Sequence, residues 1–122
     1  AINNGNGKFT VEKLPARLQL SSVNSIHCID INNDGNIDIV SGGNQFDFLP
    51  QLERLDASCG DILINDGRGS FKWIEPAQTG LKLKGQLRDI AEIHGRNKKY
   101  LLFLQNDEYP FLYEVNNLAK TK

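Results

Sequence analysis

Short apolar runs alternate with polar turns along the whole chain. The runs span residues 8–13, 25–31, 37–42, 60–65, 70–75, 87–93, 99–105 and 111–115. Each has the length of an ordinary strand, and clusters of Gly, Asn and Asp separate many of them. Little of the chain has helical spacing, so the pattern predicts an all-β fold.

An internal repeat lies within this pattern. The stretch I-N-N-G-N-G-K-F, Ile2 to Phe9, matches I-N-D-G-R-G-S-F, Ile64 to Phe71, at an offset of 64 − 2 = 62 residues. Asn and Gly tolerate positive φ and are typical of hairpin turns. Each copy therefore predicts a strand, a tight turn and a second strand.

The same offset relates a second pair of segments. Asp30 falls on Glu92, and residues 37–41 fall on residues 99–103. Both segments predict a strand, a polar turn and a strand. Four positions differ in the turn: Asn32 becomes His94, Asp34 becomes Arg96, Gly35 becomes Asn97 and Asp38 becomes Tyr100. Because the second turn has lost these carboxylates and gained a cation, we expect it to hold no metal ion.

The number of strands suggests a β-propeller, in which four-stranded antiparallel blades repeat around an axis. Residues 1–13 would end a preceding blade, 14–76 would form a complete blade, and 77–122 a final blade without its fourth strand. About two blades cannot close a ring, since propellers have about 4 to 8. We therefore expect a fragment of a larger propeller, for example a seven-bladed one, with the parent chain supplying the rest. An open two-sheet structure is the alternative.

The stretch D-I-N-N-D-G-N-I-D, Asp30 to Asp38, places oxygen donors at alternating positions between two apolar runs. Its side-chain donors are Asp30, Asn32, Asp34 and Asp38, and Gly35 permits a sharp turn. This pattern is typical of a hard-cation loop, with calcium as the first candidate. A solvated, Asx-rich turn is the alternative. An EF-hand is disfavoured, because Ser41 stands at position twelve, where that loop requires Glu.

Together with the downstream L-I-N-D-G-R-G-S-F, this loop resembles the FG-GAP or VCBS repeat, which is found in integrin α-subunit propellers. The resemblance implies a structural calcium ion bound by the side chains of Asp30, Asn32, Asp34 and Asp38 and by the carbonyl of Asn36. The chain is also similar to C-terminal blades of large secreted or surface proteins of bacteria. This similarity implies an extracellular or cell-surface location, or a periplasmic one.

Composition argues against other function classes. The net charge is −1, and no basic run is interleaved with aromatic residues, so we expect no nucleic-acid partner. No apolar run is long enough to span a membrane, so we expect no membrane insertion. His27 and His94 lack metal-ligand spacing, and no serine lies in a nucleophile elbow, so no catalytic residue is predicted. Cys28 and Cys59 are expected to be buried thiols, with one disulfide as the alternative.

An insertion from Asn44 to Cys59 separates the second and third strands of the complete blade. Long connections often carry binding residues, so the candidates for partner binding are Phe46, Phe48, Arg54 and Asp56. The alternative is that the aromatic residues cover the edge of the blade. We expect a non-enzymatic scaffold that binds a protein or a glycan. The propeller portion of a polysaccharide-active enzyme, such as a lyase, is the alternative function.

Overall fold

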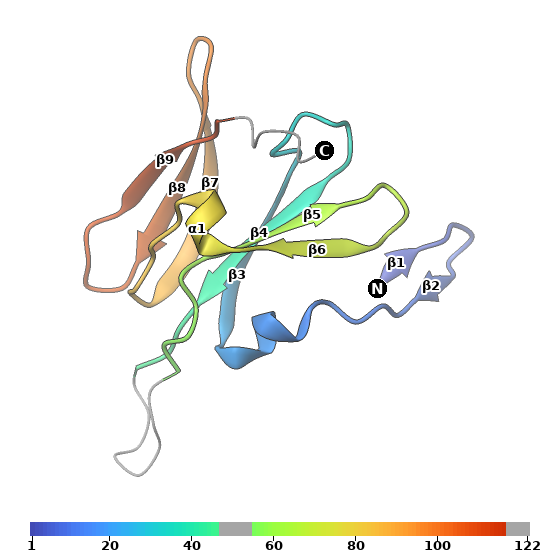
Figure 1. The fold of residues 1–122 in the computed structure, drawn as a ribbon, viewed down its shortest axis with the longest axis horizontal. Coiled ribbons are helices and arrows are strands. Elements are labelled where there is room, and N and C mark those ends of the chain that lie inside the picture. Colours follow the sequence, from blue (N-terminus) through green and yellow to red (C-terminus); the bar gives the residue numbers. More distant parts are fainter. Residues whose placement is uncertain (47–54, 117–122) are drawn as a thin grey trace.

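The structure, a computed structural model, describes residues 1–46 and 55–116 of the 122-residue chain. In this part of the chain, nine strands form three separate antiparallel sheets (Figure 1). The sheets are β1 (Ile2–Asn3) with β2 (Phe9–Thr10); β3 (Val23–Ile29), β4 (Asp38–Gly43), β5 (Asp61–Asn65) and β6 (Phe71–Ile74); and β7 (Leu87–His94), β8 (Lys99–Gln105) and β9 (Phe111–Glu114).

Each strand pairs with its neighbour in sequence, as short polar turns require. The all-β prediction is confirmed, and all eight predicted strands are present. Only two short helical turns accompany them, η1 (Ala16–Leu20) and α1 (Pro76–Thr79). None of the described sheets closes on itself.

The hairpin repeat is confirmed residue by residue. Asn3 pairs with Phe9 in β1–β2, and Asn65 pairs with Phe71 in β5–β6, so both strands keep the offset of 62. In each turn the asparagine side chain accepts a hydrogen bond of 2.9 Å from the amide two residues later, that of Gly5 or Gly67. The same Asx-turn chemistry therefore closes both hairpins.

The second pair of segments corrects the sequence alignment. Ile29 pairs with Asp38, and Ile93 pairs with Tyr100, so β3 and β7 are related by 93 − 29 = 64 residues, while β4 and β8 keep 62. Asp30 therefore corresponds to His94, and the expected match of Asp30 with Glu92 is wrong. The reason is that the turn at residues 94–99 is two residues shorter than that at 30–37, which a fixed offset does not reveal.

Further features of the repeat follow from this alignment. A bulge lies between Val23 and Ser25 and between Leu87 and Asp89. Before each four- or three-stranded sheet, a Pro-Ala pair begins a short helical turn, and Leu-x-Leu follows at residues 18–20 and 81–83. The repeated unit therefore includes the linker as well as the strands.

The core lies between the four-stranded and three-stranded sheets. Ile29, Val40 and Ile62 face it from the first sheet, each no more than 5% exposed. The second sheet contributes Ile90, Leu101 and Phe103, and the linker contributes Leu81 and Leu83. The first strands of the two sheets lie against each other, since Ser25 of β3 donates to Asp89 of β7 at 3.4 Å. This arrangement orders the sheets side by side along one direction (Figure 1).

Two expectations concern single residues and the membrane. Both cysteines are free, but Cys28 is exposed and Cys59 half-buried, so the prediction of two buried thiols is wrong. Cys28 lies on the face of β3 that points away from the core. In residues 1–46 and 55–116, no helix has the length and apolar character needed to cross a membrane.

Candidate metal centre

The Asp30 carboxylate organises the turn between β3 and β4. Its Oδ1 accepts a hydrogen bond of 3.1 Å from the amide of Asp34, and its Oδ2 accepts one of 2.9 Å from the amide of Gly35. Gly35 has φ 88°, a conformation that side chains other than Gly disfavour. The turn is therefore wound around the first predicted ligand.

Asn32 and Asp34 face each other inside this turn. The Asn32 amide nitrogen donates to Asp34 Oδ2 at 2.8 Å, and Asn32 Oδ1 accepts from the Asp34 amide at 3.1 Å. Asp34 Oδ1 in turn accepts from the amide of Asn36 at 2.8 Å. The oxygens of Asp30 and Asn32 thus meet at one amide, so the structure brings three of the predicted side-chain ligands together.

Asp38 lies deeper than the other donors and is fully buried. Its Oδ2 accepts from the amide of Ile31 at 3.0 Å, and its Oδ1 accepts from the amide of Asn65 at 2.8 Å. Burial raises the pKa of the Asp38 carboxyl above its ordinary value. The two amides lower that pKa, and the nearby charges of Asp34 and Asp30 raise it further. The three carboxylates are therefore close enough to repel one another.

The β5–β6 hairpin supports the loop from the side. Asn65 binds the loop twice, through its amide to Asp38 and through its side-chain nitrogen to the carbonyl of Ile37 at 3.1 Å. A Cβ atom at Gly67 would lie 2.8 Å from Oδ1 of Asn36, so only glycine leaves room for that side chain. Sequence reasoning missed this support, although Asn65 and Gly67 both belong to the repeated hairpin motif.

The position of the donors bears on how a cation could bind. In the described residues, no group of three or more His, Cys, Asp and Glu side chains is placed to hold a metal ion. In the loop itself, two donors are amides and one is the Asn36 carbonyl, while Asp38 binds two backbone amides. A carboxylate has about four acceptor sites, so Asp38 could bind an ion while keeping these amides. The residues present fit a calcium ion in their chemistry.

The shorter turn between β7 and β8 has different chemistry. Lys98 forms an ion pair of 2.7 Å with Glu114, and the pKa of its ammonium group is raised by that carboxylate. Lys99 reaches back to the first loop, where its Nζ donates to the carbonyl of Asp30 at 3.4 Å. A cationic turn thus lies beside the carboxylate-rich one, and we still expect it to hold no metal.

The two histidines, treated separately in the sequence, lie on either side of one carboxylate. Nε2 of His27 is 3.7 Å from Oε2 of Glu92, and Nε2 of His94 is 3.3 Å from Oε1. His27 belongs to β3, and Glu92 and His94 belong to β7. The contact therefore joins the two sheets, and no spacing rule could have found it across 92 − 27 = 65 residues.

The predicted partner-binding residues lie at the opposite end of the sheet from the loop (Figure 1). Phe46 is half-buried and Asp56 is exposed. Phe48 and Arg54 lie outside the described residues. At the base of the insertion, Gln45 and Leu55 form a bridge through hydrogen bonds of 2.8 and 3.0 Å.

Asn44 anchors this base and was not singled out in the sequence. It is 1% exposed and has φ 78°. Its Oδ1 accepts from the Ser21 hydroxyl at 2.9 Å and from the Ser58 amide at 3.0 Å. Its Nδ2 donates to the carbonyls of Ser58 at 2.8 Å and Gly85 at 3.2 Å. One side chain thus joins the insertion, the segment before β3 and the linker between the sheets.

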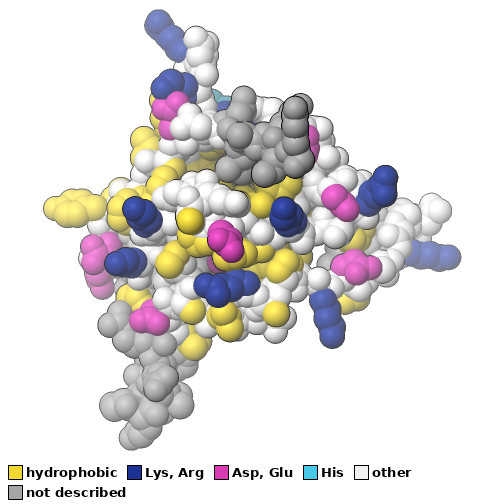
Figure 2. Space-filling view, in the orientation of Figure 1, with side chains coloured by type: hydrophobic (Ala, Val, Ile, Leu, Met, Phe, Trp, Pro, Cys, Tyr) yellow, Lys and Arg dark blue, Asp and Glu magenta, His cyan; other side chains and the backbone are white. Residues whose placement is uncertain are grey.

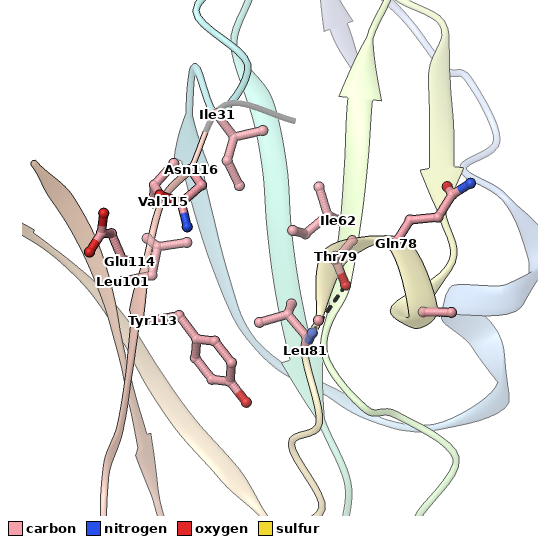
Figure 3. Close-up of a pocket in the computed structure, with 12 residues that line it drawn as sticks. Ile31, Ile62, Gln78, Thr79, Leu81, Leu101, Tyr113, Glu114, Val115 and Asn116 are labelled. Atoms are coloured by element: carbon pink, nitrogen blue, oxygen red, sulfur yellow. Dashed lines mark hydrogen bonds between the residues drawn. The ribbon is translucent and has the colours of Figure 1, made fainter. Parts of the chain in front are cut away.

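A pocket of about 370 Å³ opens between the two sheets beside α1 (Figure 3). Ile62 and Leu101 line it from the sheets, and Tyr113 points into it from β9. On its other side, Thr79 Oγ1 accepts from the amide of Leu81 at 3.2 Å. None of the predicted ligands or partner-binding residues lines this pocket.

Comparisons of the chain with protein-family models, with curated proteins and with solved structures gave no match.

Proposed function

We propose that residues 1–122 form part of a β-propeller of the FG-GAP or VCBS kind, with a structural calcium ion in the loop from Asp30 to Asp38. In this proposal the chain is a non-enzymatic scaffold outside the cytoplasm, at the cell surface or secreted. It presents connections such as the insertion to a protein or glycan partner, and the parent chain supplies the remaining blades.

One observation carries the calcium proposal. The turn is wound so that Asp30, Asn32 and Asp34 share hydrogen bonds with the same few amides, while Asp38 approaches from the buried side. Carboxylate and amide oxygens around a glycine turn are the ligands that calcium prefers. A divalent cation would also offset the repulsion between the three carboxylates.

The propeller proposal is supported by the repeated unit. The two sheets share their pairing registers, their bulge and their linker motif, and they pack side by side through apolar faces. The pairs of sheets differ from a sandwich of unrelated sheets, because one unit follows the other by a repeated relation. Such units generate a propeller when the relation is a rotation about an axis.

The calcium proposal is tested by thermal unfolding in about 2 mM calcium, in chelator and in magnesium. We expect a higher melting temperature in calcium than in chelator, and a smaller rise in magnesium, which demands a tighter octahedral site. Equal melting temperatures in calcium and chelator would contradict the proposal and leave the loop as an Asx-rich turn.

Partner binding is tested with the calcium-loaded chain on panels of immobilised glycans and extracellular proteins. Asp56→Ala tests the exposed part of the insertion, and Arg96→Ala at the opposite end of the sheet is the matched control. We expect Asp56→Ala to weaken the binding of a hit and Arg96→Ala to leave it unchanged. The reverse result would place the binding surface at the other end.

A further inference from the structure

The two outer sheet faces of the chain are related to the two faces that form its core. The registers place β7 against β3 at an offset of 64, and β8 against β4 at 62. In the third strands, Leu112 pairs with Leu102 as Ile62 pairs with Val40. Every position on the three-stranded sheet therefore has a counterpart on the four-stranded one.

The outer face of β7–β9 corresponds to the buried face of β3–β5. Its counterparts of Ile29, Val40 and Ile62 are Ile93, Leu102 and Leu112. The first three are at most 5% exposed, whereas Ile93 is 42% and Leu112 57% exposed. Leu104 beside them is 38% exposed. This face has the composition of a core face but is open to solvent.

The outer face of β3–β6 is related in the same way to the buried face of β7–β9. Ile26 and Ile39 are the counterparts of Ile90 and Leu101. Ile26 is 60% exposed, although Ile90 is 4% exposed. In the linkers, Leu20 is 53% exposed where its counterpart Leu83 is 2% exposed. Hydrophobic side chains are also visible between charged ones on the face drawn in Figure 2.

The relation also predicts which residues would meet if the two outer faces docked. Inside the chain, His27 of the first sheet lies 3.7 Å from Glu92 of the second. The counterpart of His27 is Ala91, and that of Glu92 is Cys28. A docked pair would therefore place Ala91 of one copy against Cys28 of the next. Both side chains are small and uncharged, so this contact would leave no charge unpaired.

From these relations we infer that the outer face of β7–β9 binds the outer face of β3–β6 of a second copy of the chain, head to tail. The inference rests on the blade-to-blade packing proposed above, but it does not depend on calcium. Because the interface joins two different faces, it is heterologous, and it would continue from copy to copy until a ring closes.

Sedimentation of the 122-residue chain over a range of concentrations tests the inference. We expect assemblies that grow with concentration. Leu112→Lys blocks one face and Ile26→Lys blocks the other, so each variant alone should remain a monomer. An equal mixture of the two should form dimers that grow no further, because each dimer has one intact pair of faces and two blocked ends. Tyr109→Lys is the control, since Tyr109 is 89% exposed and lies outside these sheets.

Cross-linking tests the predicted contact directly. The thiol introduced by Ala91→Cys should be joined to Cys28 of another copy by a short bismaleimide. Adding Cys28→Ser should abolish the cross-linked dimer, even though Cys59 remains. A monomeric wild-type chain, or assemblies unaffected by both lysine variants, would overturn the inference and leave the outer faces to sheets of the same polypeptide. Measuring the calcium-dependent melting temperature on the same samples separates this failure from a failure of the calcium proposal.

Discussion

The carboxylate of Asp38 binds the backbone amide of Asn65 at 2.8 Å, across 27 residues of sequence. This bond links the two motifs that the sequence offers, the Asp-rich loop and the Gly-rich hairpin. Asp38 thus has a part in the fold that does not depend on any ion, while Asp34 does not have a comparable buried position. The two carboxylates should therefore respond differently to substitution.

Asp38→Ala should lower the free energy of unfolding even in chelator. It leaves the amides of Ile31 and Asn65 without their acceptor, and each lost partner of a buried group costs about 1–3 kcal/mol. Urea unfolding in chelator measures the difference. A loss within about 0.5 kcal/mol, the range of ordinary surface substitutions, would contradict this role.

Asp34→Ala should reduce calcium affinity and remove the stabilisation that calcium provides. With a dissociation constant of about 0.1 mM and about 1 mM free calcium, that stabilisation is about 1.4 kcal/mol. Calorimetric titration and melting temperature in calcium measure the two effects. Arg96→Ala is the control and should leave both unchanged. A loss of calcium affinity in the control variant alone would argue against the assigned loop.

Gly67→Ala and Gly5→Ala form a matched pair, because the two glycines hold the same place in the repeated hairpin. Both have positive φ, 75° and 82°, so an alanine should cost about 1 kcal/mol at either position. Only Gly67 faces Asn36, whereas nothing lies within 4 Å of a Cβ at Gly5. Gly67→Ala should also weaken calcium binding, and equal calcium affinity of the two variants would contradict the proposed contact.

Asn44→Ala should destabilise the chain by about 3 kcal/mol or more, because it leaves several buried groups of Ser58 and Gly85 without partners. Asn44→Gly should lose slightly less, since glycine accepts the φ of 78°. Asn97→Ala at an exposed turn is the control, with an expected change within about 0.5 kcal/mol. Chemical unfolding followed by tryptophan fluorescence of Trp73 measures all three.

Asp66 should give the hairpin an acid-sensitive contribution. The amides of Arg68 and Ser70 hold the pKa of its carboxyl below the ordinary value of 3.8. A carboxyl with a lowered folded pKa stabilises the protein above its unfolded pKa, and this stabilisation is lost as the pH falls through the folded value. Asp66→Asn should weaken the dependence of the unfolding midpoint on pH below about 4. An identical acid limb in the two proteins would contradict this.

The strands and hairpin turns could be predicted from the sequence because their signals are local. Alternation of apolar residues and the Asn-Gly pairs needed no knowledge of distant residues. The match of Asp30 with Glu92 failed because loop length and strand register are separate properties, and only pairing reveals the latter. Asn44, Asn65 and the contact of His27 with Glu92 depend on residues brought together by sheet packing, which a single sequence does not encode in its spacing.

The bridge between Gln45 and Leu55 separates the tip of the insertion from the sheet that carries it. The ends of the tip are fixed by two backbone hydrogen bonds, and Asn44 secures the chain below them. Since the entropy of closing a loop grows only slowly with its length, the tip could be exchanged for longer or unrelated peptides at a small cost in stability. The chain thus provides a grafting position at the end of the sheet remote from the Asp-rich loop.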